Sequence, residues 1–139
     1  MKALAVCISA LAAMAAAPAF AGDLTIELTG AKARPGKIIA VLSTKDTFQK
    51  SGGMEQTVDP TDGTVRLVFR DLPPGEYAFM AFHDESQDGD LQFDAGGMPA
   101  EGWALSNADK LRGPPSFEAM KFSVPAEGAT VAVPLVYPR

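Results

Sequence analysis

The 139-residue sequence predicts an all-β chain, folded as a single antiparallel β-sandwich of six to seven strands with one long irregular loop. Several short segments alternate apolar and polar residues, which is the pattern of half-buried strands. Turns rich in Gly and Pro separate these segments, and no long segment carries a helical period. Short strands joined by such turns are typical of a sandwich.

Four strands are expected in the first part of the predicted domain. Residues 24–29 alternate apolar and polar side chains, whereas residues 37–43 are apolar on both faces, which predicts a central strand. Residues 64–69 place their apolar side chains on one face, and residues 76–83 form the most aromatic strand. A Pro-Pro-Gly turn joins these last two strands.

The second part begins with a long segment that has no regular period. Residues 84–116 are rich in Gly and Pro, so we expect one irregular loop, and loops of that length are usually functional or disordered. Residues 117–124 predict a strand or a short helix followed by a strand. Residues 130–137 predict a last strand that lies at a sheet edge or carries a bulge, because Pro134 cannot donate to a ladder.

The first residues have the pattern of a signal peptide. Lys2 precedes a small and apolar run, and Ala-Phe-Ala at residues 19–21 fits a cleavage site. We therefore expect residues 1–21 to be removed and residues 22–139 to form one domain, periplasmic or secreted. The only cysteine, Cys7, lies in the predicted signal peptide, so the mature domain would have no disulfide.

The charge of the predicted mature chain excludes two classes of partner. Residues 22–139 contain 11 basic and 17 acidic residues, a formal net charge of −6. Binding to nucleic acid or to an anionic membrane surface depends on basic contacts, so neither is expected, nor is membrane insertion after signal cleavage. No nucleophile-elbow sequence is present. We expect a monomeric protein without enzymatic activity.

An acidic segment follows the aromatic strand. Residues 84–94 contain five carboxylates and no Lys or Arg, so like charges repel one another unless something offsets them. Oxygen donors alternate along the segment, and Gly89 stands at the sixth position, as in calcium-binding loops. The predicted Ca²⁺ ligands are Asp84, Ser86, Asp88, Asp90 and Asp94.

A second interpretation of the same segment stays open. The twelfth position is Ala95, so Asp94 or the more distant Glu101 would have to replace the usual bidentate glutamate. Asp90, at the seventh position, would use its backbone carbonyl. A hydrated turn, held by hydrogen bonds from the backbone to acidic side chains, accounts for these residues without a metal.

Two further residues have alternative roles. His83, the only histidine, is either a structural residue at a strand end or a contact for a ligand. Trp103 either packs in a second core under the loop or belongs to an aromatic platform. The aromatic residues grouped with it are Phe93, Tyr77 and Phe117. The alternative function is a binding module that recognises a glycan, a peptide or an envelope protein through the 84–116 loop.

An ordered series of motifs spans residues 24–137. It runs from Asp71-Leu72-Pro73-Pro74-Gly75-Glu76-Tyr77-Ala78 to His83-Asp84-Glu85 with Asp88-Gly89, then Gly97-Met98-Pro99-Ala100-Glu101-Gly102, Ser106-Asn107 and Gly113-Pro114-Pro115-Ser116-Phe117. This series resembles the bacterial domain-of-unknown-function family 2141. The resemblance implies a small exported protein with one β-rich domain. Ser86 and Asp88 stand where that family has Asn.

The turn before the aromatic strand also resembles those of transthyretin-like (prealbumin-like) sandwiches, and an immunoglobulin-like sandwich is the alternative; either is a likeness of fold alone. The prediction is therefore an exported, non-enzymatic β-sandwich protein, with a Ca²⁺-binding loop or a partner-binding loop after residue 83.

Overall fold

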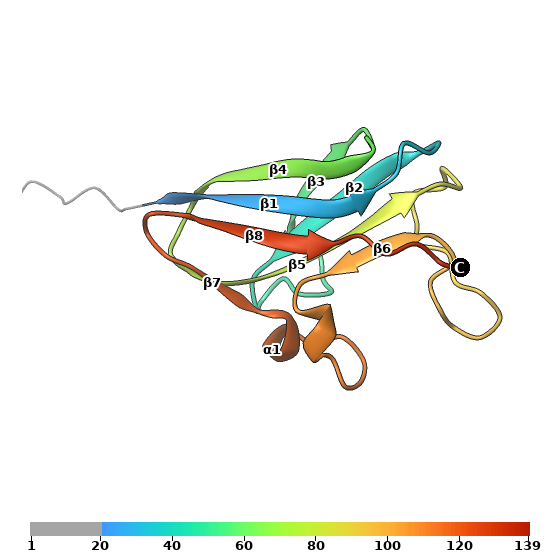
Figure 1. The fold of residues 1–139 in the computed structure, drawn as a ribbon. Helices are drawn as coiled ribbons and strands as arrows, with labels where there is room; N and C mark the ends of the chain where they lie inside the picture. Colours follow the sequence, from blue (N-terminus) through green and yellow to red (C-terminus); the bar gives the residue numbers. More distant parts are fainter. Residues whose placement is uncertain (1–20) are drawn as a thin grey trace, which may run out of the picture.

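The computed structural model describes residues 21–139, and residues 1–20, on which the predicted signal peptide falls, are outside the described residues. The described chain forms eight strands and two short helices (Figure 1). The strands are β1 (Gly22–Ala31), β2 (Lys37–Ser43), β3 (Met54–Val58), β4 (Gly63–Leu72), β5 (Gly75–Asp84), β6 (Gly102–Leu105), β7 (Phe122–Val124) and β8 (Ala129–Pro134). The helices are η1 (Ala108–Lys110) and α1 (Phe117–Met120).

The strands form two sheets. One has three strands in the order β4-β1-β8, with β1 antiparallel to β4 and parallel to β8. The other has five antiparallel strands in the order β3-β2-β5-β6, with β7 paired to β5 as well. Strands β7 and β6 share one edge of β5, since β7 pairs with Gly75–Tyr77 and β6 with Met80–His83. Figure 1 shows the three-stranded sheet lying over the other.

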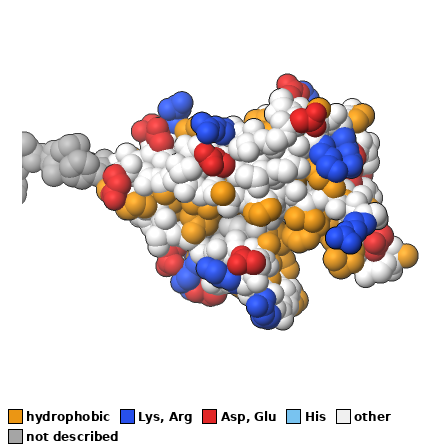
Figure 2. Space-filling model, viewed as in Figure 1, with side chains coloured by type: hydrophobic (Ala, Val, Ile, Leu, Met, Phe, Trp, Pro, Cys, Tyr) orange, Lys and Arg blue, Asp and Glu red, His pale blue; other side chains and the backbone are white. Residues whose placement is uncertain are grey.

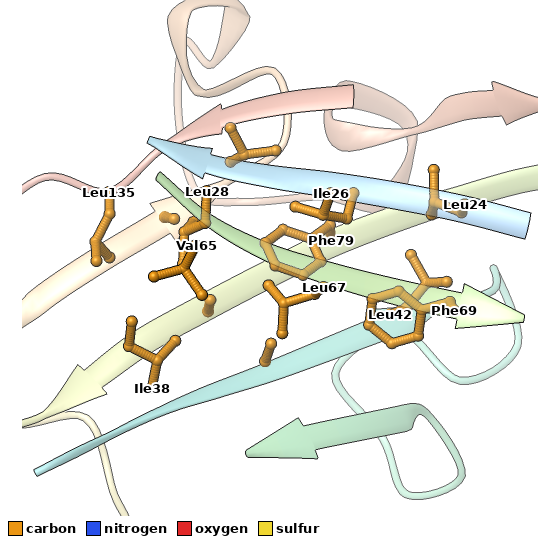
Figure 3. Packing of buried hydrophobic residues seen from close by; sticks show 14 of the residues in the cluster. Leu24, Ile26, Leu28, Ile38, Leu42, Val65, Leu67, Phe69, Phe79 and Leu135 are labelled. Atoms are coloured by element: carbon orange, nitrogen blue, oxygen red, sulfur yellow. The ribbon is translucent and has the colours of Figure 1, made fainter. Parts of the chain in front are cut away.

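The main hydrophobic core lies between the two sheets. Leu24, Ile26 and Leu28 of β1 are fully buried, while the residues between them are half-buried. They pack in one cluster with side chains of the five-stranded sheet, among them Leu42 and Phe79 (Figure 3). The alternation along β1 thus directs one face inward, as the sequence predicts.

Most predicted elements are confirmed. The chain is mostly β, β2 is central between β3 and β5, and β8 with Pro134 lies at a sheet edge. Residues 117–124 form a short helix followed by a strand. Two details are corrected. The structure has eight strands instead of six to seven, because β3 and β6 add to the predicted set, and the β1–β8 pair is parallel.

The predicted irregular loop is also corrected. Strand β6 pairs with β5 inside residues 84–116 and divides the segment into two loops, 85–101 and 106–116. Each loop leaves from an end of β6, so the two loops stand at opposite ends of the same pair of strands. Within residues 21–139, neither helix has the length and apolar character needed to cross a membrane.

Candidate functional site

The outer face of the five-stranded sheet carries an apolar floor. Because β2 and β5 are apolar on both faces, the side chains that point away from the core are hydrophobic as well. The register places them in two rows across β2, β5 and β6. The first row is Ile39, Phe82 and Trp103, and the second is Val41, Met80 and Leu105. All six side chains are half-buried.

Three loops form walls on two sides of this floor, and we call the space between them the groove. The 85–101 loop contributes Leu91, Phe93 and Met98, and the opposite side is formed by Leu111 of the 106–116 loop and Gln49 of the β2–β3 loop. The groove has a volume of about 670 Å³. Figure 2 shows the surface hollowed between two projecting lobes, with hydrophobic side chains on the walls. Pockets of this size and character bind ligands in many proteins.

The groove is apolar and uncharged along its lining. Among the described residues that line it, Gln49 is the only one with a polar side chain apart from the indole N–H of Trp103. The large hydrophobic side chains that are most exposed in residues 21–139 lie at the same place: Phe93 and Met98, 59% and 60% exposed, line the groove. Val136, 46% exposed, exchanges two backbone hydrogen bonds of 2.8 Å with Trp103. A cluster of this kind marks an interaction surface.

Hydrogen bonds to the Asp84 carboxylate shape the acidic loop. Asp84 ends β5 and is only 6% exposed. Its Oδ1 accepts from the Ser86 hydroxyl and the Asp88 N–H, both at 3.2 Å, and its Oδ2 accepts from the Gly89 N–H at 2.9 Å. Gly89 has a φ of 84°, a conformation that favours glycine. The loop therefore folds back over the carboxylate that begins it.

A second buried carboxylate fixes the loop from its other end. Glu101 is 5% exposed and precedes β6. Its Oε1 accepts from the Ser86 N–H at 2.7 Å, and its Oε2 accepts from the Gln92 N–H at 3.2 Å. Glu101 thus connects two points of the loop that are six residues apart in the sequence. These bonds hold the wall that carries Phe93 and Met98.

The other acidic residues of the loop have separate roles. The single Ser86 O–H is shared between Asp84 Oδ1 and Asp88 Oδ1, and the contact to Asp88 is the shorter, at 2.8 Å. Asp88 Oδ1 also accepts from the Asp90 N–H at 3.1 Å, and Oδ2 accepts from the Gln92 side chain. The Asp90 N–H, with a smaller effect from Ser86, lowers the pKa of the Asp88 carboxyl below its ordinary value. Asp94 caps a different turn, where Oδ1 accepts from the N–H groups of Gly96 and Met98.

These contacts match the hydrated-turn interpretation of the predicted calcium ligands. The oxygens of Asp84 and Asp88 accept N–H and O–H donors of the loop itself, whereas Asp94 serves its own turn and Asp90 is exposed. Within residues 21–139, no three His, Cys, Asp or Glu side chains are grouped as a metal site requires. The loop's own donors therefore occupy these oxygens, and a calcium titration decides between the two interpretations.

His83 lies in a closed hydrogen-bond network on the core side of β5. It is fully buried, and its Nε2 lies 3.0 Å from the Pro35 carbonyl oxygen, which can only accept. The proton is therefore assigned to Nε2, and Nδ1 accepts from the Tyr137 hydroxyl at 2.8 Å. The same hydroxyl accepts from the Lys32 N–H at 3.0 Å. Burial raises the pKa of the Tyr137 phenol. Every polar atom of this network has a partner, which favours the structural role of His83.

The predicted aromatic set divides into three environments. Trp103 and Phe93 line the groove, on its floor and its wall. Tyr77 belongs to the main core, and Phe117 packs with Ala78 and Met120 in a small cluster under α1. The platform interpretation therefore fits Trp103 and Phe93, and the core interpretation fits the other two.

One comparison with known proteins identifies the family. The family model described as an uncharacterized protein conserved in bacteria, DUF2141, matches residues 26–132. The chain belongs to the DUF2141 family. This confirms the resemblance that the motif series indicates. No curated protein and no solved structure matches the chain. The matched DUF2141 segment includes both loops and all three strands that form the groove.

Some groove residues of this DUF2141 member are absent from the sequence prediction. Met80, Phe82 and Val41 are predicted strand residues, but their outward direction gives them a second role. The sequence pattern that could have indicated the groove is the apolar character of residues 37–43 on both faces, since a strand of that kind needs cover on both sides.

Proposed function

We propose that this protein is an exported, monomeric, non-enzymatic binding module, whose groove takes up the apolar part of a ligand. The observation that carries the proposal is the uncharged groove of about 670 Å³ on the outer face of the five-stranded sheet. The export step is supported by the signal pattern of residues 1–21.

The lining favours apolar ligands over sugars. A glycan needs several hydrogen-bond partners because its hydroxyl groups lose water on binding. Gln49 and the indole of Trp103 are the polar side-chain groups available among the described lining residues. Apolar surface, by contrast, gains free energy by leaving water, at about 25 cal/mol per Å².

The same lining supports a role without catalysis. The described residues that line the groove include no Asp, Glu, His, Lys, Cys or Ser. Those are the side chains that general acid–base and nucleophilic catalysis use most often.

We also infer that the two sheets make a β-sandwich of the transthyretin-like or immunoglobulin-like class. The support is the single core between the two layers, to which β1, β2, β4, β5 and β8 all contribute. Such a rigid body suits a module that binds through loops at its surface.

A neutral dye tests the binding function. N-phenyl-1-naphthylamine is titrated into the protein, while the emission of Trp103, the only tryptophan, is recorded. We expect saturable dye emission and quenching of Trp103, because this side chain lies on the groove floor. No saturable binding, or binding that leaves Trp103 emission unchanged, would overturn the proposal.

Two matched valine variants test whether the dye binds in the groove. Val41 lies on the groove floor, and Val68 is an equally half-buried strand residue of the three-stranded sheet. Val41→Ser should weaken dye binding about fivefold, since roughly 1 kcal/mol of apolar contact is lost, whereas Val68→Ser should have no effect. Equal effects of the two variants would contradict binding in the groove.

A further inference from the structure

We propose that the groove binds an amphipathic helix of a partner protein, about three turns long, with Lys or Arg along one flank and Asp or Glu along the other. This inference rests on the proposed function and names the class of its ligand. Four features of the structure support it: the kind of surface, its dimensions, the cover that it lacks, and the charges of its walls.

The groove is a sheet face, which selects for a helix. An extended peptide usually joins a sheet at an edge, where backbone N–H and C=O groups pair with it. The groove offers the peptide apolar side chains instead, such as Met80 and Phe82. An extended backbone would lose water there without gaining hydrogen bonds, whereas a helix satisfies its own backbone groups.

The width of the groove fits one helix. On β5, Ala78 is covered by Phe117 and Met120, and Asp84 begins the opposite wall. These two positions are six residues apart, which is about 20 Å along a strand at about 3.3 Å per residue. A helix with its side chains is about 10–12 Å across, so it fits between the side chains of the two walls.

The length of the floor sets the length of the helix. The two rows run across β2, β5 and β6, and β3 extends them at its edge with the exposed residues Glu55 and Thr57. Two strand spacings of about 4.8 Å make about 10 Å for the apolar floor, and β3 adds a third spacing, for about 14 Å. A helix rises about 1.5 Å per residue, so about ten residues, or three turns, span this length, and the last turn lies over the polar residues of β3.

The sheet has only partial cover on this side. An apolar sheet face is normally buried by another layer of structure. Here α1 and its cluster cover the end at Ala78. The two rows beyond it are half-buried, and Phe93 and Met98 stand exposed beside them. A partner helix would continue the layer that α1 begins.

The two walls carry opposite charges. The 85–101 loop exposes Asp88, Asp90 and Asp94. The opposite side exposes Lys50, Lys110 and Arg112 and one acid beside them, Asp109, so its excess charge is positive. The lining residues Leu91, Phe93, Gln49 and Leu111 lie within two positions of these charges in the sequence. None of these seven charged residues takes part in an ion pair within residues 21–139.

The opposite charges of the two walls determine which charges the two flanks of the helix should carry. The flank beside the acidic wall gains from Lys or Arg, and the flank beside the basic wall gains from Asp or Glu, as at the outer positions of a coiled coil. A helix that turns end for end in the groove exchanges its flanks. The charges therefore also select the direction in which the helix lies.

Synthetic peptides test the inference. The probe has about 14 residues, no Trp, Leu at helical spacing, Lys on one flank and Glu on the other. Two peptides with the same Leu positions carry Lys on both flanks or Glu on both flanks. A fourth has the composition of the probe with Leu at alternating positions. Binding is followed by Trp103 emission at low and at high salt. We expect the mixed-flank helix to bind about threefold to tenfold more tightly than the others, with the advantage reduced by salt.

Charge reversal in the protein sharpens the test. Asp90 is exposed, and its side chain forms no hydrogen bond with residues 21–139, so Asp90→Lys should not disturb the fold. This variant should bind the mixed-flank peptide about threefold to tenfold more weakly and the peptide with Glu on both flanks more tightly. Glu127→Lys, a reversal in the loop between β7 and β8, is the matched control and should change neither affinity.

Three results would overturn the inference. Equal affinity for all flank patterns would show that the charges of the walls do not select the ligand, while the dye-binding function would stand. Binding of the alternating-Leu peptide as tightly as the helical probe would show that the ligand need not be a helix. A stable dimer by sedimentation equilibrium, with dye binding lost on dimer formation, would show that a second copy covers the groove. Failure of the dye to bind at Trp103 would reject the proposed function as well, whatever the peptides do.

Discussion

Replacing Glu101 by glutamine should loosen the acidic wall of the groove. In the native protein both carboxylate oxygens of this buried residue accept backbone N–H groups, from Ser86 at 2.7 Å and from Gln92 at 3.2 Å. Glutamine has the same shape but offers one carbonyl oxygen and one NH₂ group. In either orientation of the amide, one backbone N–H faces a donor and loses its partner.

The magnitude follows from this mismatch. A buried donor without an acceptor costs about 1–3 kcal/mol, and bonds to a charged acceptor are stronger than neutral ones. We therefore expect Glu101→Gln to lower stability by about 2 kcal/mol. For a domain of this size, about 1 kcal/mol changes the melting temperature by about 4 °C, so a decrease of about 8 °C is expected.

Two measurements check the expectation. Thermal unfolding gives the global effect, with Glu127→Gln as the matched control, because Glu127 is exposed and its loss should change the midpoint by less than about 2 °C. Amide hydrogen exchange at Ser86 and Gln92 gives the local effect, and about 2 kcal/mol corresponds to exchange about 30-fold faster. If the variant melts within about 2 °C of the native protein and both amides keep their protection, Glu101 does not hold the loop.

Three further outcomes are expected. Adding about 5 mM Ca²⁺ and then a chelator should move the melting midpoint by less than about 1 °C, whereas a millimolar site would add about 1 kcal/mol, or about 4 °C. The Asp90 N–H lowers the pKa of the Asp88 carboxyl, so the ionised carboxylate stabilises the folded protein above pH 3.8, and this stabilisation is lost as the pH falls further. An NMR titration of Asp88 with a midpoint at or above 3.8 would contradict this expectation. The Asp88→Asn variant should lack this pH dependence of stability. Tyr137→Phe removes the hydroxyl that bonds His83 Nδ1 and the Lys32 N–H, and should cost about 1–3 kcal/mol in urea unfolding; a loss below about 0.5 kcal/mol would argue against the network.

Local patterns in the sequence were sufficient for the long strands. The alternation in residues 24–29 reflects a strand with one face in the core, and it predicts β1 without knowledge of its neighbours. The double apolar character of residues 37–43 predicts the central position of β2. The same apolar pattern includes residues of the groove floor, because Ile39 and Val41 point away from the core. Hydropathy alone did not indicate whether that second face is covered by the chain or left open.

The acidic loop was predictable in position but not in its contacts. Alternating oxygen donors and a glycine at the sixth position suit a calcium loop and a hydrated turn equally well. The choice depends on where the oxygens point. Asp84 and Glu101 are distant in the sequence, yet both accept N–H groups of the same loop. A one-dimensional pattern contains no information on that convergence.

Strand β6 shows why the groove itself was missed. Gly102–Leu105 is four residues long, too short for a period to be recognised, and it is a strand because one edge of β5 supplies its hydrogen bonds. Its first residue must be small, since a Cβ on Gly102 would come within 2.6 Å of the Tyr137 ring. That close packing and the pairing with β5 together place Trp103 beside Phe82. Without β6 the groove would lack one side of its floor, and the two loops would be a single segment with no fixed separation. The candidate binding site therefore depends on a contact between distant parts of the chain, which becomes visible only when the sheet is assembled.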